Sequence, residues 1–201
     1  MLTQDEIRRQ IEAIGPWHYN HVIDGISTGD SPIEEVHPKL QQLINANAFP
    51  RNVYPKVLDL GANSGLLSMW FADRKLAHVT AVEGNPRYFN QLEFVIKAKG
   101  YTGRIFPIHQ DLHKPKLSSN MYDLVLCLGL LHHIRPAQHL RLLKACYRAL
   151  IPSGETVIQT DDQLPVERLL WDSGFQGVEK LLTHWHDRAA WKAVRDPMKL
   201  W

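Results

Sequence analysis

The sequence predicts a doubly wound α/β fold built on one mostly parallel sheet of seven strands. From about residue 56 onward, short apolar runs alternate with segments of helical periodicity, a pattern that favours a parallel sheet covered on both faces. The run Tyr122–Leu128 is apolar on both faces, as a central strand of such a sheet should be. The predicted strands are 57–60, 78–82, 104–108, 122–128, 155–160, 177–183 and 189–195, the last two forming a closing hairpin.

Helices are predicted between most of these strands. The segments with helical periodicity are 66–74, 86–99, 136–150 and 166–173. Pro152-Ser153-Gly154 predicts a turn that leads into the fifth strand.

The residues before the sheet predict an N-terminal helical cap. Residues 3–14 carry isoleucines at helical spacing, and Thr3 followed by Glu6 is a capping-box pattern. Gly15-Pro16 ends this helix, residues 15–32 form an ordered loop or short strand, and a second helix spans 33–47. We therefore expect an N-terminal extension or lid at 1–50 and a core domain at 51–201.

Composition points to a globular protein with a full apolar core. The chain has 201 residues, 44% hydrophobic and 22% charged, with a net charge of +2, so its charge neither demands nor excludes a nucleic-acid partner. The two cysteines lie in apolar patterns without a CxxC neighbour, so buried thiols and no metal site are expected. With no secretory signal and no apolar run of membrane-spanning length, we expect a cytoplasmic protein without a membrane partner. The oligomeric state is not predicted.

Ligands of doubly wound sheets bind beyond the carboxyl ends of the strands, so the residues that follow each strand are the candidate ligand contacts. The first strand leads into Gly61-Ala62-Asn63-Ser64-Gly65, where two glycines allow a sharp turn and close approach to a ligand. A dinucleotide pyrophosphate site would need a GxGxxG loop, whereas here Asn63 stands in place of the second glycine. The loop therefore favours a cofactor without phosphate.

Polar residues also follow the next three strands. Glu83 comes 22 residues after Gly61 and suits the hydroxyls of a ribose. Asp111 could accept a hydrogen bond from an adenine amino group, and His132-His133 follow the fourth strand. Each alone has a structural explanation, as a tight turn, a solvated acid, a helix cap or a packed imidazole; their order after four successive strands is the stronger signal.

These motifs resemble those of the class I S-adenosylmethionine-dependent methyltransferases. Val57–Gly65 looks like their first motif, Ala81–Asn85 like the second, Tyr122–Leu126 like the fourth-strand motif, and Leu130–Ile134 like the phrase that follows it. The resemblance covers about residues 55–196 and implies a Rossmann-like methyltransferase fold with S-adenosyl-L-methionine as cofactor. The cofactor-binding residues that it implies are Asp59, Gly61, Asn63, Gly65, Glu83, Gly84, Asn85, Asp111, Leu112 and Leu128.

A closer similarity is to the group that includes the tRNA wobble-uridine carboxymethyltransferases and small-molecule relatives. It rests on Gly15-Pro16-Trp17, on Ile23–Thr28 and on Leu128–His133. The carboxymethylating members hold a carboxylated cofactor with cationic and tyrosine side chains. Here His18-Tyr19 stand where they have a lysine, and His132-His133 where they have Tyr-His. Without that clamp, plain S-adenosylmethionine is expected.

The function that follows is an S-adenosylmethionine-dependent methyltransferase acting on the oxygen or nitrogen of a small molecule. His132 or His133 is the candidate general base. Trp17, His18, Tyr19 and His21 are the candidate acceptor-binding residues on a segment that closes over the site, and packing of that segment on the sheet is the equally weighted alternative.

Two other hypotheses remain open at this stage. An RNA methyltransferase would need cations around the mouth of the pocket, and the candidates are Arg8, Arg9, Arg51, Lys114, Lys116 and Arg135. A non-catalytic S-adenosylmethionine-binding protein is the second, and the intact glycine loop and Glu83 argue against it.

Overall fold

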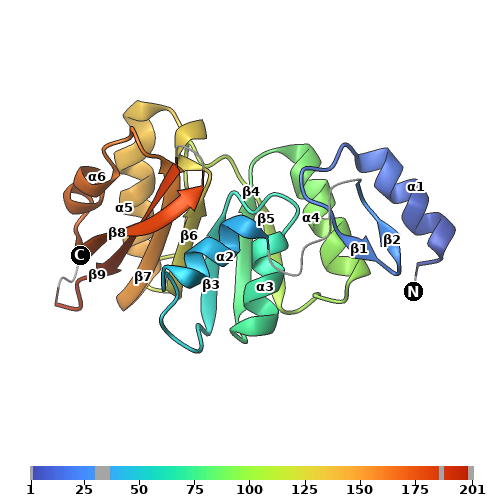
Figure 1. Ribbon diagram of the computed structural model, residues 1–201, viewed down its shortest axis with the longest axis horizontal. Helices are drawn as coiled ribbons and strands as arrows, with labels where there is room; N and C mark the ends of the chain where they lie inside the picture. The colour runs from blue at the N-terminus through green and yellow to red at the C-terminus, as the bar shows by residue number, and fades with distance from the viewer. Residues whose placement is uncertain (1, 30–36, 186–187, 199–201) are drawn as a thin grey trace.

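The computed structural model describes residues 2–29, 37–185 and 188–198 (Figure 1). In chain order its elements are α1 (Gln4–Ile14), β1 (Val22–Ile23), β2 (Ile26–Ser27), α2 (Pro38–Asn45), β3 (Lys56–Leu60), α3 (Leu66–Arg74), β4 (His78–Glu83), α4 (Pro86–Ala98), β5 (Ile105–His109), β6 (Tyr122–Leu128), the 3-10 turns η1 (Leu131–His133) and η2 (Pro136–Gln138), α5 (His139–Ala149), β7 (Leu150–Asp161), α6 (Val166–Asp172), β8 (Phe175–Trp185) and β9 (Arg188–Arg195).

The central sheet has seven strands in the order β5-β4-β3-β6-β7-β9-β8. The first five of these run parallel, and β9 then pairs antiparallel with both β7 and β8. The sequence prediction of a doubly wound, mostly parallel seven-stranded sheet is confirmed. The strand order changes direction between β3 and β6, so the ligand-binding crevice of such a sheet is expected at their carboxyl ends.

Two apolar cores lie on the two faces of the sheet. Successive strand residues point to opposite faces, so Val57 packs into one core and Leu58 into the other. The first core joins the sheet to α1, α2, α3 and α4, and the second joins it to α5 and α6. The helix layers therefore differ in origin, with the N-terminal helices on one face and the C-terminal helices on the other.

The N-terminal segment is fastened to α4, which lies beside α1 and the β1–β2 hairpin in Figure 1. Helix α1 starts at Thr3 with the predicted capping box, in which Thr3 and Glu6 bond to each other's backbone N–H groups. The side-chain amide of Gln91 on α4 donates to the carbonyl oxygens of Ile14 and Pro16 at 2.8 and 3.0 Å. These bonds fix the chain where α1 ends.

Several sequence predictions differ from the structure in detail. The helix expected at 33–47 is α2 at Pro38–Asn45, and residues 33–36 lie outside the described residues. The helix expected at 136–150 begins with a 3-10 turn before α5. The turn expected at 152–154 is a bulge inside β7: Tyr122 pairs with Leu150 but Leu124 pairs with Glu155, so extra residues loop out of the ladder, with Ser153 at a φ of 61°.

None of the helices within the described residues is both long enough and apolar enough to span a membrane.

Candidate functional site

A cavity of about 630 Å³ opens at the carboxyl ends of the parallel strands. It is bounded by the loops that follow β3, β4, β5 and β6, by the N-terminal segment and α2, and by the start of β9. The residues that line it are His18, Tyr19, Lys39, Gly61, Asn63, Glu83, Gly84, Asn85, Tyr88, Asp111, Leu112, His113, Leu128, Gly129, Leu130, His133, Ile134 and Arg188. Eight of the ten residues expected to bind the cofactor are in this set.

The glycine loop after β3 turns sharply because residues within it have a left-handed backbone conformation. Gly61 has a φ of +74° and Asn63 a φ of 52°, and the N–H groups of Gly61 and Ala62 both donate to the Val82 carbonyl of β4. A Cβ at Gly61 would lie 3.2 Å from the Leu130 side chain. The loop is thus held close to the strand ends, with bare backbone at the cavity wall.

Gly65 has a different role from the one that its motif suggested. It is the N-cap of α3 with a φ of +87°, and a Cβ there would lie 2.6 Å from Leu92 Cδ1 of α4. It does not line the cavity, so the structure gives this glycine a packing role between two helices.

Glu83 is the best-held carboxylate of the cavity. It is 8% exposed, and its two oxygens accept from the backbone N–H groups of Asn63 at 2.8 Å and Asn85 at 2.7 Å. A carboxylate has about four lone-pair sites, so each oxygen keeps one for a ligand donor. A pair of neighbouring hydroxyls fits that arrangement.

Gly84 lets the ends of β4 and β5 approach each other beside this carboxylate. A Cβ on Gly84 would lie 3.1 Å from the Gln110 carbonyl oxygen, which is tighter than an ordinary contact. Asn85 then caps α4 with its side-chain oxygen, which accepts from the N–H groups of Arg87 and Tyr88. The sequence Glu83-Gly84-Asn85 therefore places a carboxylate, a close backbone approach and a helix start at one corner of the cavity.

Asp111 sits at the same end but is much more exposed. Its carboxylate accepts from the backbone N–H of His113 and contacts the His113 ring nitrogen Nδ1, both at 2.9 Å, and its side chain is 63% exposed. The hydrogen bond from the His113 backbone holds the pKa of Asp111 below its usual value. Leu112, between them, is buried and supplies an apolar wall.

Asp59 lies behind the cavity rather than on its wall. It is 1% exposed and accepts from the Ser68 hydroxyl of α3 at 2.6 Å. Burial raises the pKa of Asp59 to about 6, against the opposing effects of Ser68 and Lys39. This aspartate ties β3 to α3 and is not among the lining residues.

The two adjacent histidines are separated by the structure. His133 lines the cavity, whereas His132 does not. His132 contacts the Thr160 hydroxyl through Nδ1 at 3.2 Å and accepts from Arg188 through Nε2 at 3.4 Å, and burial lowers its pKa. His132 therefore supports Arg188, and His133 is the histidine that can reach a ligand.

The four candidate acceptor-binding residues divide in the same way. His18 and Tyr19 line the cavity, with Tyr19 edge-on to His18. Trp17 and His21 do not line it: the Trp17 indole donates to the Ile11 carbonyl at 3.0 Å, and His21 contacts the Ser64 hydroxyl at 2.8 Å. The segment therefore does both things that were considered for it: Trp17 and His21 pack against the core, and His18 and Tyr19 line the cavity.

His21 links the N-terminal segment to the glycine loop. It is 2% exposed, and burial lowers its pKa to about 3, so the imidazole is neutral over the physiological range. Its partner Ser64 is fully buried within the loop that follows β3. The hydrogen bond between the neutral His21 ring and Ser64 therefore holds the segment that carries Tyr19 against the glycine loop.

Seven lining residues were missed by the sequence analysis: Lys39, Tyr88, His113, Gly129, Leu130, Ile134 and Arg188. Lys39 had a detectable signal, because it lies on the buried face of α2 together with Leu40 and Leu43. The sequence comparison expected no cationic clamp at the positions of His18-Tyr19 and His132-His133. Lys39 and Arg188 bring two cationic side chains to the cavity from other positions. The six cations proposed for RNA binding are all outside the lining set.

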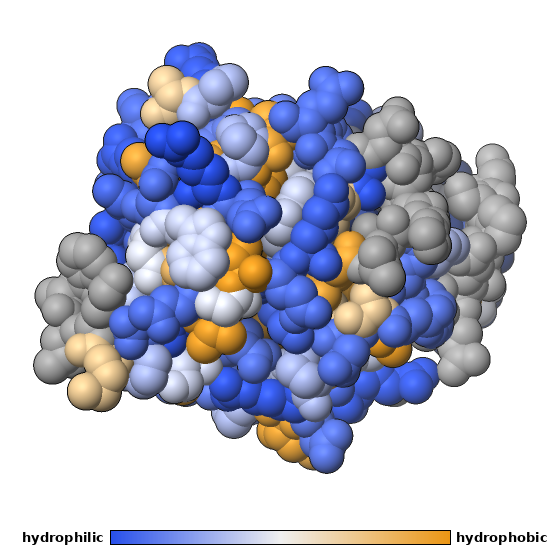
Figure 2. All heavy atoms as spheres, turned by 60° about the vertical axis from the view of Figure 1, so that its left-hand side comes forward, coloured by the Kyte–Doolittle hydropathy of each residue, from blue (hydrophilic) through white to orange (hydrophobic). Residues whose placement is uncertain are grey.

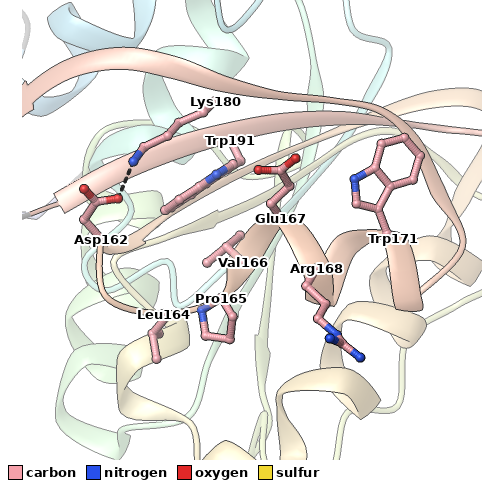
Figure 3. A pocket seen from close by; sticks show the side chains of 9 residues that line it. All are labelled: Asp162, Leu164, Pro165, Val166, Glu167, Arg168, Trp171, Lys180 and Trp191. Carbon is pink, nitrogen blue, oxygen red and sulfur yellow. Dashed lines mark hydrogen bonds and ion pairs between the residues drawn. The ribbon is translucent and has the colours of Figure 1, made fainter.

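A second groove, of about 470 Å³, lies between α6 and the β8–β9 hairpin (Figure 3). Lys180 and Asp162 form an ion pair across it at 2.5 Å, and the side chain of Trp171, which projects from α6, is half exposed. On this side of the molecule apolar residues form small separate patches in a hydrophilic surface (Figure 2). None of the predicted site residues lines this groove, so the strand-end cavity is the candidate site.

Known proteins similar to this chain are methyltransferases. Residues 57–154 match the family model described as a methyltransferase domain. A ubiquinone biosynthesis O-methyltransferase of Pseudomonas putida (strain GB-1) is 26% identical over 159 residues, which are 75% of this chain and 62% of that protein. The chain thus spans less than two thirds of that relative.

Solved structures share the fold at low sequence identity. The N-terminal domain of EvdMO1, crystallised in the presence of SAH and D-fucose, superposes with a TM-score of 0.74 and 20% identity, over 98% of this chain and 97% of that one. Phosphoethanolamine N-methyltransferase 2 of Haemonchus contortus, in complex with S-adenosyl-L-methionine, gives a TM-score of 0.66 and 16% identity over 79% of this chain and 52% of that one. The chain therefore shares its fold with these solved structures, and residues 57–154 are similar to the methyltransferase-domain family.

Proposed function

We propose that the protein transfers a methyl group from S-adenosyl-L-methionine to a small-molecule acceptor. The observation that carries this proposal is the Glu83 carboxylate, buried at the cavity wall and held by two backbone N–H groups with lone pairs left over. It lies beside a glycine loop that matches the methyltransferase-domain family. A non-catalytic binding protein would not need His133 and Tyr19 at the other end of the same cavity.

The residues present fit this cofactor. Glu83 would accept from both ribose hydroxyls, and Asp111 would accept from the adenine amino group beside Leu112. Gly61 and Gly84 leave no side chain where the nucleoside must approach the backbone. When bound, the cofactor supplies an activated methyl group on a positively charged sulfur, which departs as a neutral thioether.

The protein's own contribution is alignment, water exclusion and one proton acceptor. Tyr19 and His18 close the cavity from the N-terminal segment, and His133 is the candidate base for an acceptor hydroxyl or amine. His132 acts through Arg188, which it contacts, and does not reach the cavity itself. Residues 1–50 serve in this proposal as an extension that completes the acceptor half of the site on the core formed by 51–201.

Small-molecule methylation is supported by the relatives. The Pseudomonas protein is an O-methyltransferase of ubiquinone biosynthesis, and the EvdMO1 domain was crystallised with a sugar. We propose O- or N-methylation here. The likeness to the group of the tRNA wobble-uridine carboxymethyltransferases and their small-molecule relatives also remains a proposal.

Calorimetry with S-adenosylhomocysteine tests the cofactor assignment. Wild-type protein should bind, and Glu83→Gln and Glu83→Ala should weaken binding by about 1–3 kcal/mol, the scale of a lost hydrogen bond to a charged group. Glu93→Ala, on the exposed face of α4, is the matched control and should leave the affinity unchanged. Absence of wild-type binding at millimolar ligand would refute the proposal.

A further inference from the structure

Two cations converge on the end of the cavity opposite Glu83. Lys39 reaches it from α2 and Arg188 from the start of β9, and both line the cavity. A Cβ built on Gly129 would lie 2.9 Å from Lys39 Nζ and 3.5 Å from Arg188 Nη1. Both side chains therefore approach the same point, just after β6, from elements about 150 residues apart in sequence.

Lys39 is the unusual member of this pair. It is 6% exposed, yet within the described residues no hydrogen bond or ion pair joins its ammonium to a neighbour. Burial, followed by repulsion from Arg188, lowers the pKa of Lys39 to about 8, while the Asp59 carboxylate attracts it at longer range. A buried charge without a close partner is costly, so a site that retains one usually gives it an anion to bind.

Arg188 is held in place but only partly neutralised. Its Nε lies 3.6 Å from the Asp161 carboxylate, which is half exposed, and its Nη2 contacts His132. Nη1 is the nitrogen that faces Gly129. The guanidinium is therefore oriented by residues outside the cavity, with one donor group turned inward.

The cofactor proposed above does not remove this positive charge. S-adenosylmethionine carries a sulfonium and an ammonium against one carboxylate, so its binding adds one net positive charge to the cavity. An uncharged acceptor would leave that excess in place, whereas an anionic acceptor would offset it. Resting on the proposed function, we propose that Lys39 and Arg188 bind the carboxylate of an anionic methyl acceptor.

The carboxylate that these cations bind could belong to the acceptor or to the amino-acid tail of the cofactor, and the two must be distinguished. The position of Arg188, on β9 and braced by His132 and Asp161, favours the acceptor, because the nucleoside corner of the cavity is formed by the loops after β4 and β5. Binding to the tail alone is the competing outcome.

Acetate and its neutral isostere acetamide can probe the subsite without a known acceptor. The amide signal of Gly129 would be followed by NMR in protein saturated with S-adenosylhomocysteine. We expect acetate to shift it with millimolar affinity and acetamide to bind at least about tenfold more weakly. Lys39→Met and Arg188→Met should each weaken acetate by about tenfold or more, equivalent to 1.4 kcal/mol. Lys114→Met, an exposed cation outside the lining set, should not.

Nucleoside binding distinguishes failure of this inference from failure of the proposed function. Affinities for S-adenosylhomocysteine and for 5′-methylthioadenosine, which lacks the amino-acid tail, should change by less than about threefold in Lys39→Met. A tenfold loss for the first ligand alone would assign the cation to the cofactor tail and overturn the inference, while the proposed function would stand. No acetate-dependent shift at Gly129 would overturn it equally.

The folding stability of Lys39→Met provides a further readout. Since the methionine removes a buried ammonium that has no close partner among the residues described, the variant should be as stable as wild type or more so in urea unfolding. A loss of several kcal/mol would show that Lys39 has a structural partner and would overturn the inference.

Discussion

The two ends of the cavity are built in different ways. The end at Glu83 and Asp111 consists of residues at or just beyond the carboxyl ends of parallel strands, and backbone N–H groups of the loops after β3, β4 and β5 hold the two carboxylates. The end at Lys39 and Arg188 is assembled from the N-terminal segment, α2 and the last strand. The first end is a local consequence of strand order, and the second depends on tertiary packing. In the function proposed here, the first end binds the cofactor and the second binds the acceptor.

The largest effect is expected at the glycine loop. Gly61→Val should reduce S-adenosylhomocysteine affinity at least about 100-fold, or ~2.8 kcal/mol, because a side chain would stand against Leu130 in a backbone conformation that β-branched residues avoid. Gly100→Val is the matched control, since Gly100 has nearly the same φ, +75°, with nothing within 4 Å of a Cβ. If both variants kept wild-type affinity in calorimetry, the loop would not form the nucleoside end.

A smaller effect, on the pH dependence of folding stability, is expected at His21, which links the N-terminal segment to the glycine loop. Because the folded-state pKa is depressed to about 3 from 6.5, the unfolded chain binds more protons between these values, and stability falls as the pH drops through that window. From pH 6.5 to pH 5 the His21 contribution is about 1.7 kcal/mol, because the slope rises toward 1.36 kcal/mol per pH unit only as the unfolded imidazole becomes fully protonated.

Urea unfolding at the two pH values measures this term. His21→Gln should reduce the pH dependence by the same amount, whereas the exposed His78→Gln should retain it. Identical pH dependence in wild type and His21→Gln would mean that His21 is not buried as a neutral imidazole.

The smallest effect is expected at Asp111. Its side chain is 63% exposed, so water replaces a lost hydrogen bond readily. Asp111→Asn should weaken S-adenosylhomocysteine by less than about threefold, well below the loss at Glu83. A larger loss of affinity in Asp111→Asn than in Glu83→Gln would show that Asp111, and not Glu83, is the main contact of the nucleoside.

The fold and one end of the site were accessible from the sequence because they follow from local rules. Alternating apolar segments predicted the sheet, and the residues after β3, β4 and β5 had to meet at one edge of it. Gly65 and Asp59 were assigned to the site by motif, but in the folded protein their contacts are with Leu92 and Ser68.

The other end was less accessible because its residues meet only through tertiary packing. Lys39 could be noticed in the sequence as a cation on the apolar face of a predicted helix. No sequence pattern marks Arg188, because its position depends on the closing hairpin and on His132. His132 and His133 are adjacent in sequence, and no periodicity distinguishes the one that packs from the one that faces the cavity.

The central claim is that the strand-end cavity holds the nucleoside of the methyl donor against Glu83. A crystal structure of the protein with S-adenosylhomocysteine tests it most directly. The account predicts both ribose hydroxyls within hydrogen-bond distance of the Glu83 oxygens and the thioether sulfur on the side of His133 and Tyr19. A ligand bound elsewhere, or bound in this cavity with the ribose away from Glu83, would contradict it.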